Sequence, residues 1–232
     1  MDSSRFDKFA DEYYALHARN IEITGESPDY FAEYKIRDVH QQVSATGPCE
    51  DLRILDFGSG VGNSVPFFRQ YFPSCHLVCA DVSVRSLDLA RRRFGELASY
   101  VLFTGERLPF RSGAFDIAFS ACVFHHIAPT EHITLLREIR RVLSEHSGRL
   151  FLYEHNPLNP LTLHAVNTCA FDSDAVLIPS RRMRRQLRDA GYSHISICYR
   201  VFFPRHLKFM RFLELKLRFL PLGAQYCIVG TA

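Results

Sequence analysis

The sequence predicts an α/β protein built on a parallel sheet, and three observations support this class. From residue 52 onward, short apolar strands alternate with amphipathic helices, as in a parallel sheet covered by helices. The first strand runs into a glycine-rich turn at residues 58–62, Gly-Ser-Gly-Val-Gly, and an acidic residue, Asp81, ends the second strand. Glycines let a ligand approach the backbone and a helix N-terminus, and the carboxylate stands at the spacing used for a ribose diol. The pair therefore predicts a nucleoside cofactor.

Two helices are expected before the sheet. Residues 6–18 place aromatic side chains on or near one face, and residues 29–43 repeat apolar side chains at helical spacing. Ser27-Pro28 opens the second helix and a Thr-Gly-Pro sequence ends it. We expect residues 1–49 to form a helical lid and residues 50–232 to form the cofactor-binding catalytic domain, within one globular domain overall.

Turn and capping residues delimit the alternating elements. Pro73 ends the first crossover helix, Ser83 can cap the second, and Gly113, Gly148 and Gly191 mark later turns. The expected strands lie at residues 52–57, 76–80, 100–103, 115–121, 149–153, 193–203 and 225–230. The expected helices between them lie at residues 63–71, 84–97, 131–143, 181–190 and 207–220. Segments at about residues 156–178 and 205–222 are inserts, because a simple alternating sheet does not require them.

Composition excludes several classes of protein. The chain has 232 residues, enough for one ordinary domain, and a net charge of +3, too small to indicate nucleic-acid binding. No apolar stretch is long enough to span a membrane, and the N-terminus lacks a secretory apolar region. The seven cysteines contain no CxxC pair, so neither a metal site nor a disulfide framework is expected. A cytoplasmic protein with reduced thiols follows from this pattern.

Polar residues follow the fourth and fifth strands, at the edge where open α/β sheets bind ligands. His125 and His126 follow the fourth strand; we expect His125 to line a pocket and His126 to pack the adjacent turn. Glu154 and His155 end the fifth strand and offer a base for an acceptor. The catalytic candidates are thus His125, Glu154 and His155. The Asn-Pro pairs that follow, at residues 156–157 and 159–160, are typical of consecutive turns and compatible with a substrate rim.

Two basic segments leave alternatives open. Residues 181–188 carry five arginines on a predicted helix, which either bind an anion or form a solvated face. Residues 205–220 mix cations with large apolar side chains. Such a helix either packs on the core or lies on a membrane surface, with the cations Arg205, Lys208, Arg211 and Arg218 at the headgroups. Peripheral membrane contact is therefore one expectation.

The motifs as a whole closely resemble the class I S-adenosylmethionine-dependent methyltransferases, in the small-molecule branch that includes ubiquinone-type enzymes. The motifs that carry the resemblance are Asp56-x-Gly58-x-Gly60-x-Gly62, Asp81, Leu108-Pro109-Phe110 and Phe115-Asp116-Ile117. The resemblance covers about residues 50–155. It implies a Rossmann-like sheet of seven strands, mostly parallel with an antiparallel C-terminal strand, and helices on both faces. It also implies S-adenosyl-L-methionine as cofactor and a small-molecule or lipid-like acceptor, with oxygen the favoured acceptor atom.

The same resemblance implies which residues bind the cofactor. Asp56 suits a ligand with an amino group, and no P-loop Lys-Ser/Thr follows the turn. Thr104 stands where the family usually has an aspartate that accepts from the adenine amino group; its hydroxyl can still accept. The cofactor-binding candidates are Asp56, Gly58, Ser59, Gly60, Asp81, Val82, Thr104, Gly105, Glu106 and Ser120.

Two other functions compete with a methyltransferase. An NAD(P)-dependent oxidoreductase would use a similar fold, but Asp56 and a C-terminal sheet strand argue against it. A catalytically silent cofactor-binding scaffold would keep the same glycines. The fourth strand is followed neither by Asn/Asp-Pro-Pro-aromatic nor by Pro-Cys, the patterns of nucleic-acid methylating enzymes, so no nucleic-acid partner is expected.

Overall fold

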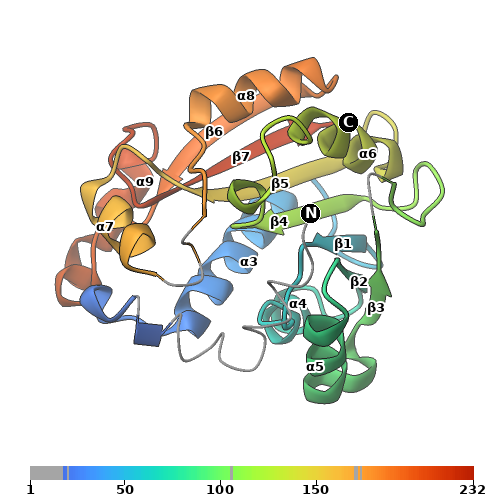
Figure 1. The fold of residues 1–232 in the computed structure, drawn as a ribbon, viewed down its shortest axis with the longest axis horizontal. Coiled ribbons are helices and arrows are strands. Elements are labelled where there is room, and N and C mark those ends of the chain that lie inside the picture. Colours follow the sequence, from blue (N-terminus) through green and yellow to red (C-terminus); the bar gives the residue numbers. More distant parts are fainter. Residues whose placement is uncertain (1–17, 20, 105–106, 170–171, 173) are drawn as a thin grey trace.

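One seven-stranded sheet runs through the part of the chain that the computed structural model describes, residues 18–232 without 20, 105–106, 170–171 and 173 (Figure 1). Its strand order is β3-β2-β1-β4-β5-β7-β6. The strands are β1 (Arg53–Phe57), β2 (His76–Asp81), β3 (Ser99–Leu102), β4 (Ile117–Ala121), β5 (Arg149–His155), β6 (Ser193–Arg200) and β7 (Gln225–Thr231). All but the last residue of the helix expected at residues 6–18 lies outside the described residues.

The strand directions confirm the predicted fold class. The pairs from β3 to β5 are all parallel, whereas β7 is antiparallel to both β5 and β6. The chain moves outward from β1 toward β3, then returns to place β4 on the other side of β1. At this switch point the loops after β1 and β4 diverge, which opens a crevice beyond their carboxyl ends.

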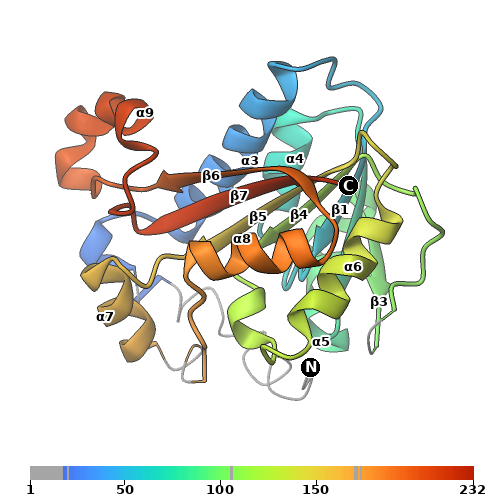
Figure 2. The same ribbon diagram turned by 90° about the horizontal axis from the view of Figure 1, so that it is seen from above.

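Helices cover both faces of the sheet, as expected (Figure 2). Side chains of α3 and α4 pack with one face in one buried cluster, and side chains of α6 and α8 pack with the other face. The α-helices are α3 (Pro28–Ser44), α4 (Val65–Tyr71), α5 (Val84–Phe94), α6 (His132–Val142), α7 (Pro160–Thr168), α8 (Ser180–Asp189) and α9 (Glu214–Leu217). The 3-10 helices are η1 (Glu22–Thr24), η2 (Gly95–Leu97), η3 (Phe124–His126) and η4 (Arg205–Leu213).

Helix α3 is part of the core as well as a wall of the pocket described below. Ser27 caps it by accepting a hydrogen bond from the Tyr30 N–H, and its Ile36 and Val39 are fully buried. Asp38 accepts hydrogen bonds from Arg200 on β6 and from the Tyr153 hydroxyl on β5. Packing and these bonds fix α3 against the sheet, while the role of residues 1–49 as a lid stays a prediction.

The two inserts differ from the sequence-based expectations. The first Asn-Pro pair after β5 forms the expected turn, but the second does not, because Asn159 caps α7 by accepting from the Thr162 N–H and Pro160 occupies its first turn. The segment expected as a helix at residues 207–220 is helical as far as Leu217. It consists of a 3-10 helix, η4, with non-helical backbone at Leu207, followed by the short α9.

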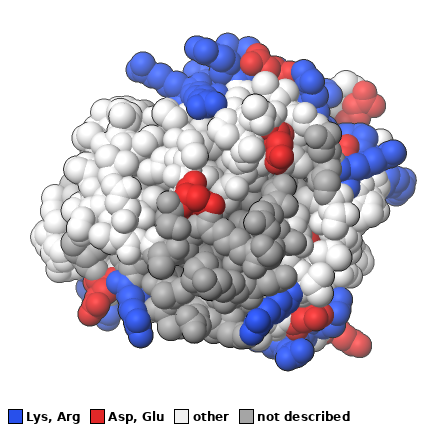
Figure 3. All heavy atoms as spheres, in the orientation of Figure 1, with Lys and Arg blue, Asp and Glu red and all other residues white. Residues whose placement is uncertain are grey.

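Helix α8 is strongly amphipathic. Met183 and Leu187 are fully buried against the sheet, while the arginines point outward. Figure 3 shows a corresponding group of basic side chains over α8. The pattern is that of a solvated helix face. In the described part of the chain, no helix has both the length and the apolar character needed to cross a bilayer.

Candidate functional site

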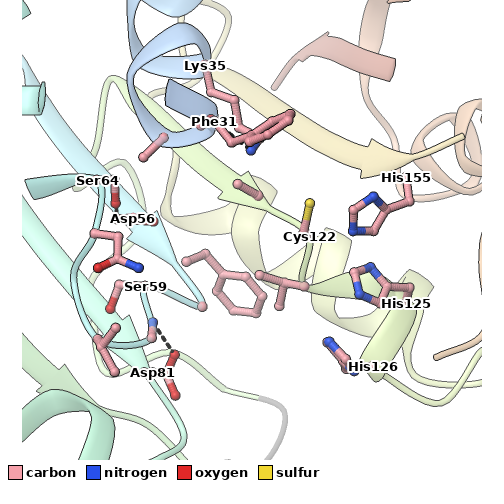
Figure 4. A pocket seen from close by; sticks show the side chains of 18 of the residues that line it. Phe31, Lys35, Asp56, Ser59, Ser64, Asp81, Cys122, His125, His126 and His155 are labelled. Carbon is pink, nitrogen blue, oxygen red and sulfur yellow. Dashed lines mark hydrogen bonds between the residues drawn. The ribbon is translucent and has the colours of Figure 1, made fainter. Parts of the chain in front are cut away.

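A pocket of about 240 Å³ lies beyond the carboxyl ends of β1, β2, β4 and β5. The glycine turn and the acids of β1 and β2 form one wall, and the histidines after β4 and β5 form the opposite wall (Figure 4). Phe31 and Lys35 of α3 face the space between these two walls. The strand order thus brings together side chains that are far apart in the sequence.

The turn after β1 needs glycine for two different reasons. Gly58 and Gly60 have φ of +73° and +54°, a backbone region that side chains other than glycine rarely adopt. A Cβ at Gly58 would stand 2.5 Å from a methyl group of Val123, whereas a Cβ at Gly60 would meet no atom within 4 Å. Gly58 therefore permits close packing against the loop after β4, and Gly60 leaves open space in the pocket.

Two carboxyl groups stand beside this turn. Asp56 is 2% exposed, and burial raises its pKa to about 7 although the Ser64 hydroxyl donates a hydrogen bond to it. Asp81 accepts from the backbone N–H of Gly60 at 2.8 Å and of Ser83 at 2.9 Å. Because a carboxylate has about four acceptor positions, Asp81 can still accept from a ligand hydroxyl.

Glu154 organises the loop after β4 rather than lining the pocket. It accepts from the backbone N–H of Val123 at 3.1 Å and of Phe124 at 2.7 Å, and it lies 2.6 Å from Nδ1 of His125. Cys122, which precedes Val123 in the loop after β4, has φ of +58° and faces the pocket. Strain of this kind often marks functional loops.

Two of the three histidines that line the pocket, His125 and His155, have pKa values shifted in opposite directions. Burial would lower the pKa of His125, but Glu154 and Asp172 outweigh it and raise the pKa to about 10. His155, whose ring centroid is 5.2 Å from that of His125, has its pKa lowered to about 4 by burial and by the charge of His125. At neutral pH His125 is therefore protonated, whereas His155 is a neutral imidazole able to accept a proton.

The other predicted residues divide into three groups. Ser59 and Val82 line the pocket with Asp56, Gly58, Gly60 and Asp81. Ser120 is buried in β4 and Thr104 is exposed, and neither is among the lining residues. Gly105 and Glu106 lie outside the described residues. His126 also lines the pocket, with its Nε2 3.4 Å from Asp172.

The sequence analysis did not predict two charged residues that line the pocket, Lys35 and Asp172. Lys35 is buried, and its Nζ donates to the Phe31 carbonyl at 3.0 Å; burial lowers its pKa. Its position is readable in retrospect, because residues 31, 35 and 39 share one helix face. Asp172 follows α7 in an irregular segment, and no local pattern marks it as part of the site.

Three groups on this wall have a spacing that a metal ion would accept. One ligand atom each of His125, His126 and Asp172 lies within 4.8 Å of the others. The attraction between the Asp172 carboxylate and the two imidazoles, whose Nε2 atoms lie 3.7 Å and 3.4 Å away, accounts for the same arrangement. Burial would raise the pKa of Asp172, but the histidines outweigh it and hold this pKa well below its usual range.

The fold and the site together define a nucleotide-cofactor-binding α/β protein of the Rossmann-like class. Residues 55–152 match the protein family described as a methyltransferase domain. These residues are therefore similar to a methyltransferase domain, and solved structures that share the fold include S-adenosylmethionine-dependent methyltransferases. The competing NAD(P)-dependent reading receives no support from this match.

Relatives agree with this assignment. An uncharacterized methyltransferase of Bacillus subtilis is 33% identical over 127 residues, covering 53% of this chain and 49% of the relative. A ubiquinone biosynthesis O-methyltransferase of Cereibacter sphaeroides is 28% identical over 144 residues, covering 59% and 57%. The chain thus spans about half the length of these curated relatives. A solved structure from Thermotoga maritima shares the fold, with a TM-score of 0.67. It is described as an S-adenosylmethionine-dependent methyltransferase and possible histamine N-methyltransferase. The two chains are 19% identical, and the match covers 99% of each.

Proposed function

We propose that this protein transfers a methyl group from S-adenosylmethionine to an oxygen atom of a small-molecule acceptor. One observation carries the proposal: a single pocket places the glycine turn, Asp56 and Asp81 opposite the neutral imidazole of His155. A relative named as a ubiquinone biosynthesis O-methyltransferase supports oxygen as the acceptor atom.

The residues present fit the cofactor. Asp56 is a buried acid that a ligand ammonium group would stabilise in its ionised form, and Gly60 leaves the space that a Cβ would occupy. Asp81 would hold the ribose hydroxyls, and the buried Lys35 would face the carboxylate of the amino-acid part. When bound, the cofactor supplies a methyl group that is already electrophilic because its sulfur is positively charged.

The chain's own residues then have two tasks, to orient the acceptor and to remove its proton. In this scheme His155 accepts the hydroxyl proton because it lines the pocket and is unprotonated at neutral pH, although its pKa of about 4 makes it a weak base. His125 is a positioning residue: Glu154 and Asp172 hold it protonated, and its charge beside His155 keeps that imidazole neutral. Phe31 and Val166 supply apolar walls that exclude water from the acceptor.

Substitution of the two histidines tests this scheme. His155→Ala should lower turnover by about 10² or more while leaving S-adenosylmethionine affinity nearly unchanged, because only the proton acceptor is removed. The measurement is release of S-adenosylhomocysteine with a panel of phenol, quinol and carboxylic-acid acceptors, alongside calorimetry of cofactor binding. If His155→Ala keeps its turnover and His125→Ala or Glu154→Gln loses it, the base lies at the other histidine. If no acceptor in the panel is turned over, the result favours the alternative of a catalytically silent cofactor-binding scaffold.

The proposal extends to partners and location. A small-molecule acceptor, lipid-like in its apolar body, suits a pocket that α3 and α7 wall with apolar side chains. All seven cysteines are free, which supports a reducing compartment, the cytoplasm. The arginines of α8 lie on an exposed helix face, and nothing about them calls for a nucleic-acid partner.

A further inference from the structure

Residues 205–222 form a surface segment in which Arg211 and Glu214 face inward while several large apolar side chains face outward. Arg211 pairs with Glu26 at 2.6 Å, and its guanidinium lies 4.7 Å from the ring centroid of Tyr30. Glu214 accepts hydrogen bonds from the backbone N–H of Phe202 and Phe203. The expectation that Arg211 would be a surface cation was therefore wrong, because it anchors the segment.

The outward side chains form a row. Phe209, Phe212 and Leu215 are spaced three residues apart and are 70%, 71% and 74% exposed. In a 3-10 helix, residues three apart lie above one another, so η4 places Phe209 and Phe212 on one face, and Leu215 follows three residues later in α9. Phe219 and Leu222 continue the exposed apolar surface at 70% and 62%. A cluster of large side chains this exposed is unusual on a monomer and marks an interaction site.

Exposed leucines of α7 belong to the same end of the molecule. The Asn159 amide, at the start of α7, donates to the Leu222 carbonyl at 2.7 Å, which joins the helix to the end of the segment. Leu158 and Leu161 are exposed there. Figures 1 and 2 both place α7 and α9 at the same end of the molecule, and Figure 3 shows that flank almost without charged side chains. We call this surface, formed by Leu158, Leu161, Phe209, Phe212, Leu215, Phe219 and Leu222, the apolar patch.

The apolar patch carries positive charge at the same end. Residues 205–222 contain five Lys or Arg and one acidic residue, Glu214, which is used inward. Arg205, Lys208, Lys216 and Arg218 are exposed and are interspersed with the phenylalanines in the sequence of this segment. Aromatic and leucine side chains with interspersed cations are the composition of surfaces that insert into the interface of an anionic bilayer.

We propose that the apolar patch docks the protein on an anionic lipid surface. The docked patch brings the active-site pocket next to the bilayer, since Ala165 and Val166 of α7 line the pocket while Leu158 and Leu161 belong to the patch. The docking itself is independent of the methyl transfer; delivery of an apolar acceptor from the bilayer to the pocket rests on the proposed function.

Vesicle sedimentation tests the docking. The full chain should sediment with phosphatidylcholine vesicles that contain phosphatidylglycerol, and less with phosphatidylcholine alone or at high salt. The double substitution Phe209→Ser and Phe212→Ser should lower vesicle binding at least tenfold, and Lys208→Glu with Lys216→Glu should remove its dependence on anionic lipid. The matched control is Arg184→Glu with Arg185→Glu on α8, which should leave binding nearly unchanged. Equal thermal unfolding midpoints in all variants show that they are folded, and this readout does not depend on the methyltransferase proposal.

A fluorescent probe gives a second measurement. The chain contains no tryptophan, so Phe212→Trp introduces a single indole at the centre of the apolar patch. Its emission should shift to shorter wavelength on addition of anionic vesicles, whereas the emission of Leu97→Trp, at an exposed site on η2, should not. Absence of vesicle binding, or binding that survives the double serine substitution, overturns the proposal. Self-association that the same substitution abolishes would assign the apolar patch to a second copy instead.

Discussion

Charge burial at single residues decides how the pocket would hold its cofactor. Asp56 and Lys35 both line the pocket and are both buried, which is costly for ionisable groups unless a counter-charge is supplied. The pKa of Asp56 is raised and that of Lys35 is lowered, in each case first by burial. A zwitterionic ligand that meets both groups would relieve both costs.

The affinity for S-adenosylmethionine should rise with pH around neutrality. Asp56 has a pKa of about 7 in the free protein, so it is mostly protonated at pH 6 and mostly ionised at pH 8. Only the ionised form attracts an ammonium group, so affinity should increase by about tenfold over this interval. Calorimetry at pH 6, 7 and 8 measures it. Asp56→Asn should bind weakly with a flat profile, and a wild-type profile without slope contradicts the assignment of Asp56.

Removal of Asp81 should weaken cofactor binding. The carboxylate would make two charge-assisted hydrogen bonds to the ribose hydroxyls, each worth about 1.5–3 kcal/mol. Asp81→Ala should therefore bind S-adenosylmethionine at least tenfold more weakly. Asp88→Ala, on the exposed face of α5, serves as control and should bind normally. Unchanged affinity in Asp81→Ala would place the ribose elsewhere.

At the scale of elements, the turn between β1 and α4 contains two glycines with different roles. One permits close packing and the other, two residues later, leaves space for a ligand. Gly58 touches the loop after β4, while Gly60 faces open pocket space. The two glycines share positive φ, yet substitution should have different consequences at each.

Valine at these two glycines should separate stability from binding. Gly60→Val should abolish cofactor binding with a stability loss of about 1–2 kcal/mol from backbone strain. Gly58→Val should lose both, because its side chain would collide with Val123. Thermal unfolding and calorimetry distinguish the two cases. The double substitution Gly58→Ala with Val123→Ala should recover part of the stability that Gly58→Ala alone loses. Normal binding by Gly60→Val would mean that the pocket is not the cofactor site.

At the scale of the whole molecule, one ionic contact joins the N-terminal helix to the far edge of the sheet. Asp38 of α3 lies 2.7 Å from Arg200 of β6, and the Tyr153 hydroxyl of β5 donates to the same carboxylate. The Arg200 pKa is raised by this pair. Because α3 also contributes Phe31 and Lys35 to the pocket, the contact links the stability of the molecule to its site.

Loss of this contact should destabilise the whole protein. Asp38→Ala leaves a largely buried guanidinium without its carboxylate, and should lower the free energy of unfolding by about 3 kcal/mol. Asp88→Ala removes an exposed pair with Arg91 and should cost less than about 0.5 kcal/mol. Urea unfolding measures both. Equal losses for the two variants would show that the Asp38 contact contributes no more than a surface ion pair.

The sequence by itself determined the sheet, the glycine turn and the position of Asp81. Strand periodicity, turn residues and caps act over a few neighbouring residues, so residues 52–155 could be predicted nearly element by element. The sequence could not predict that His125 is protonated and His155 neutral. These protonation states depend on the distances among His125, Glu154, Asp172 and His155.

Only the tertiary structure decided three features. Lys35 and Asp172 enter the pocket from α3 and from the segment after α7, since chain crossings bring these distant residues together. Asn159 begins a helix where its local sequence is equally typical of a turn. In the segment at residues 205–217, which forms η4 and α9, the inward contacts of Arg211 and Glu214 leave the phenylalanines on the outside. Local sequence sets which residues are apolar, but long-range contacts set which face is left for water or for a partner.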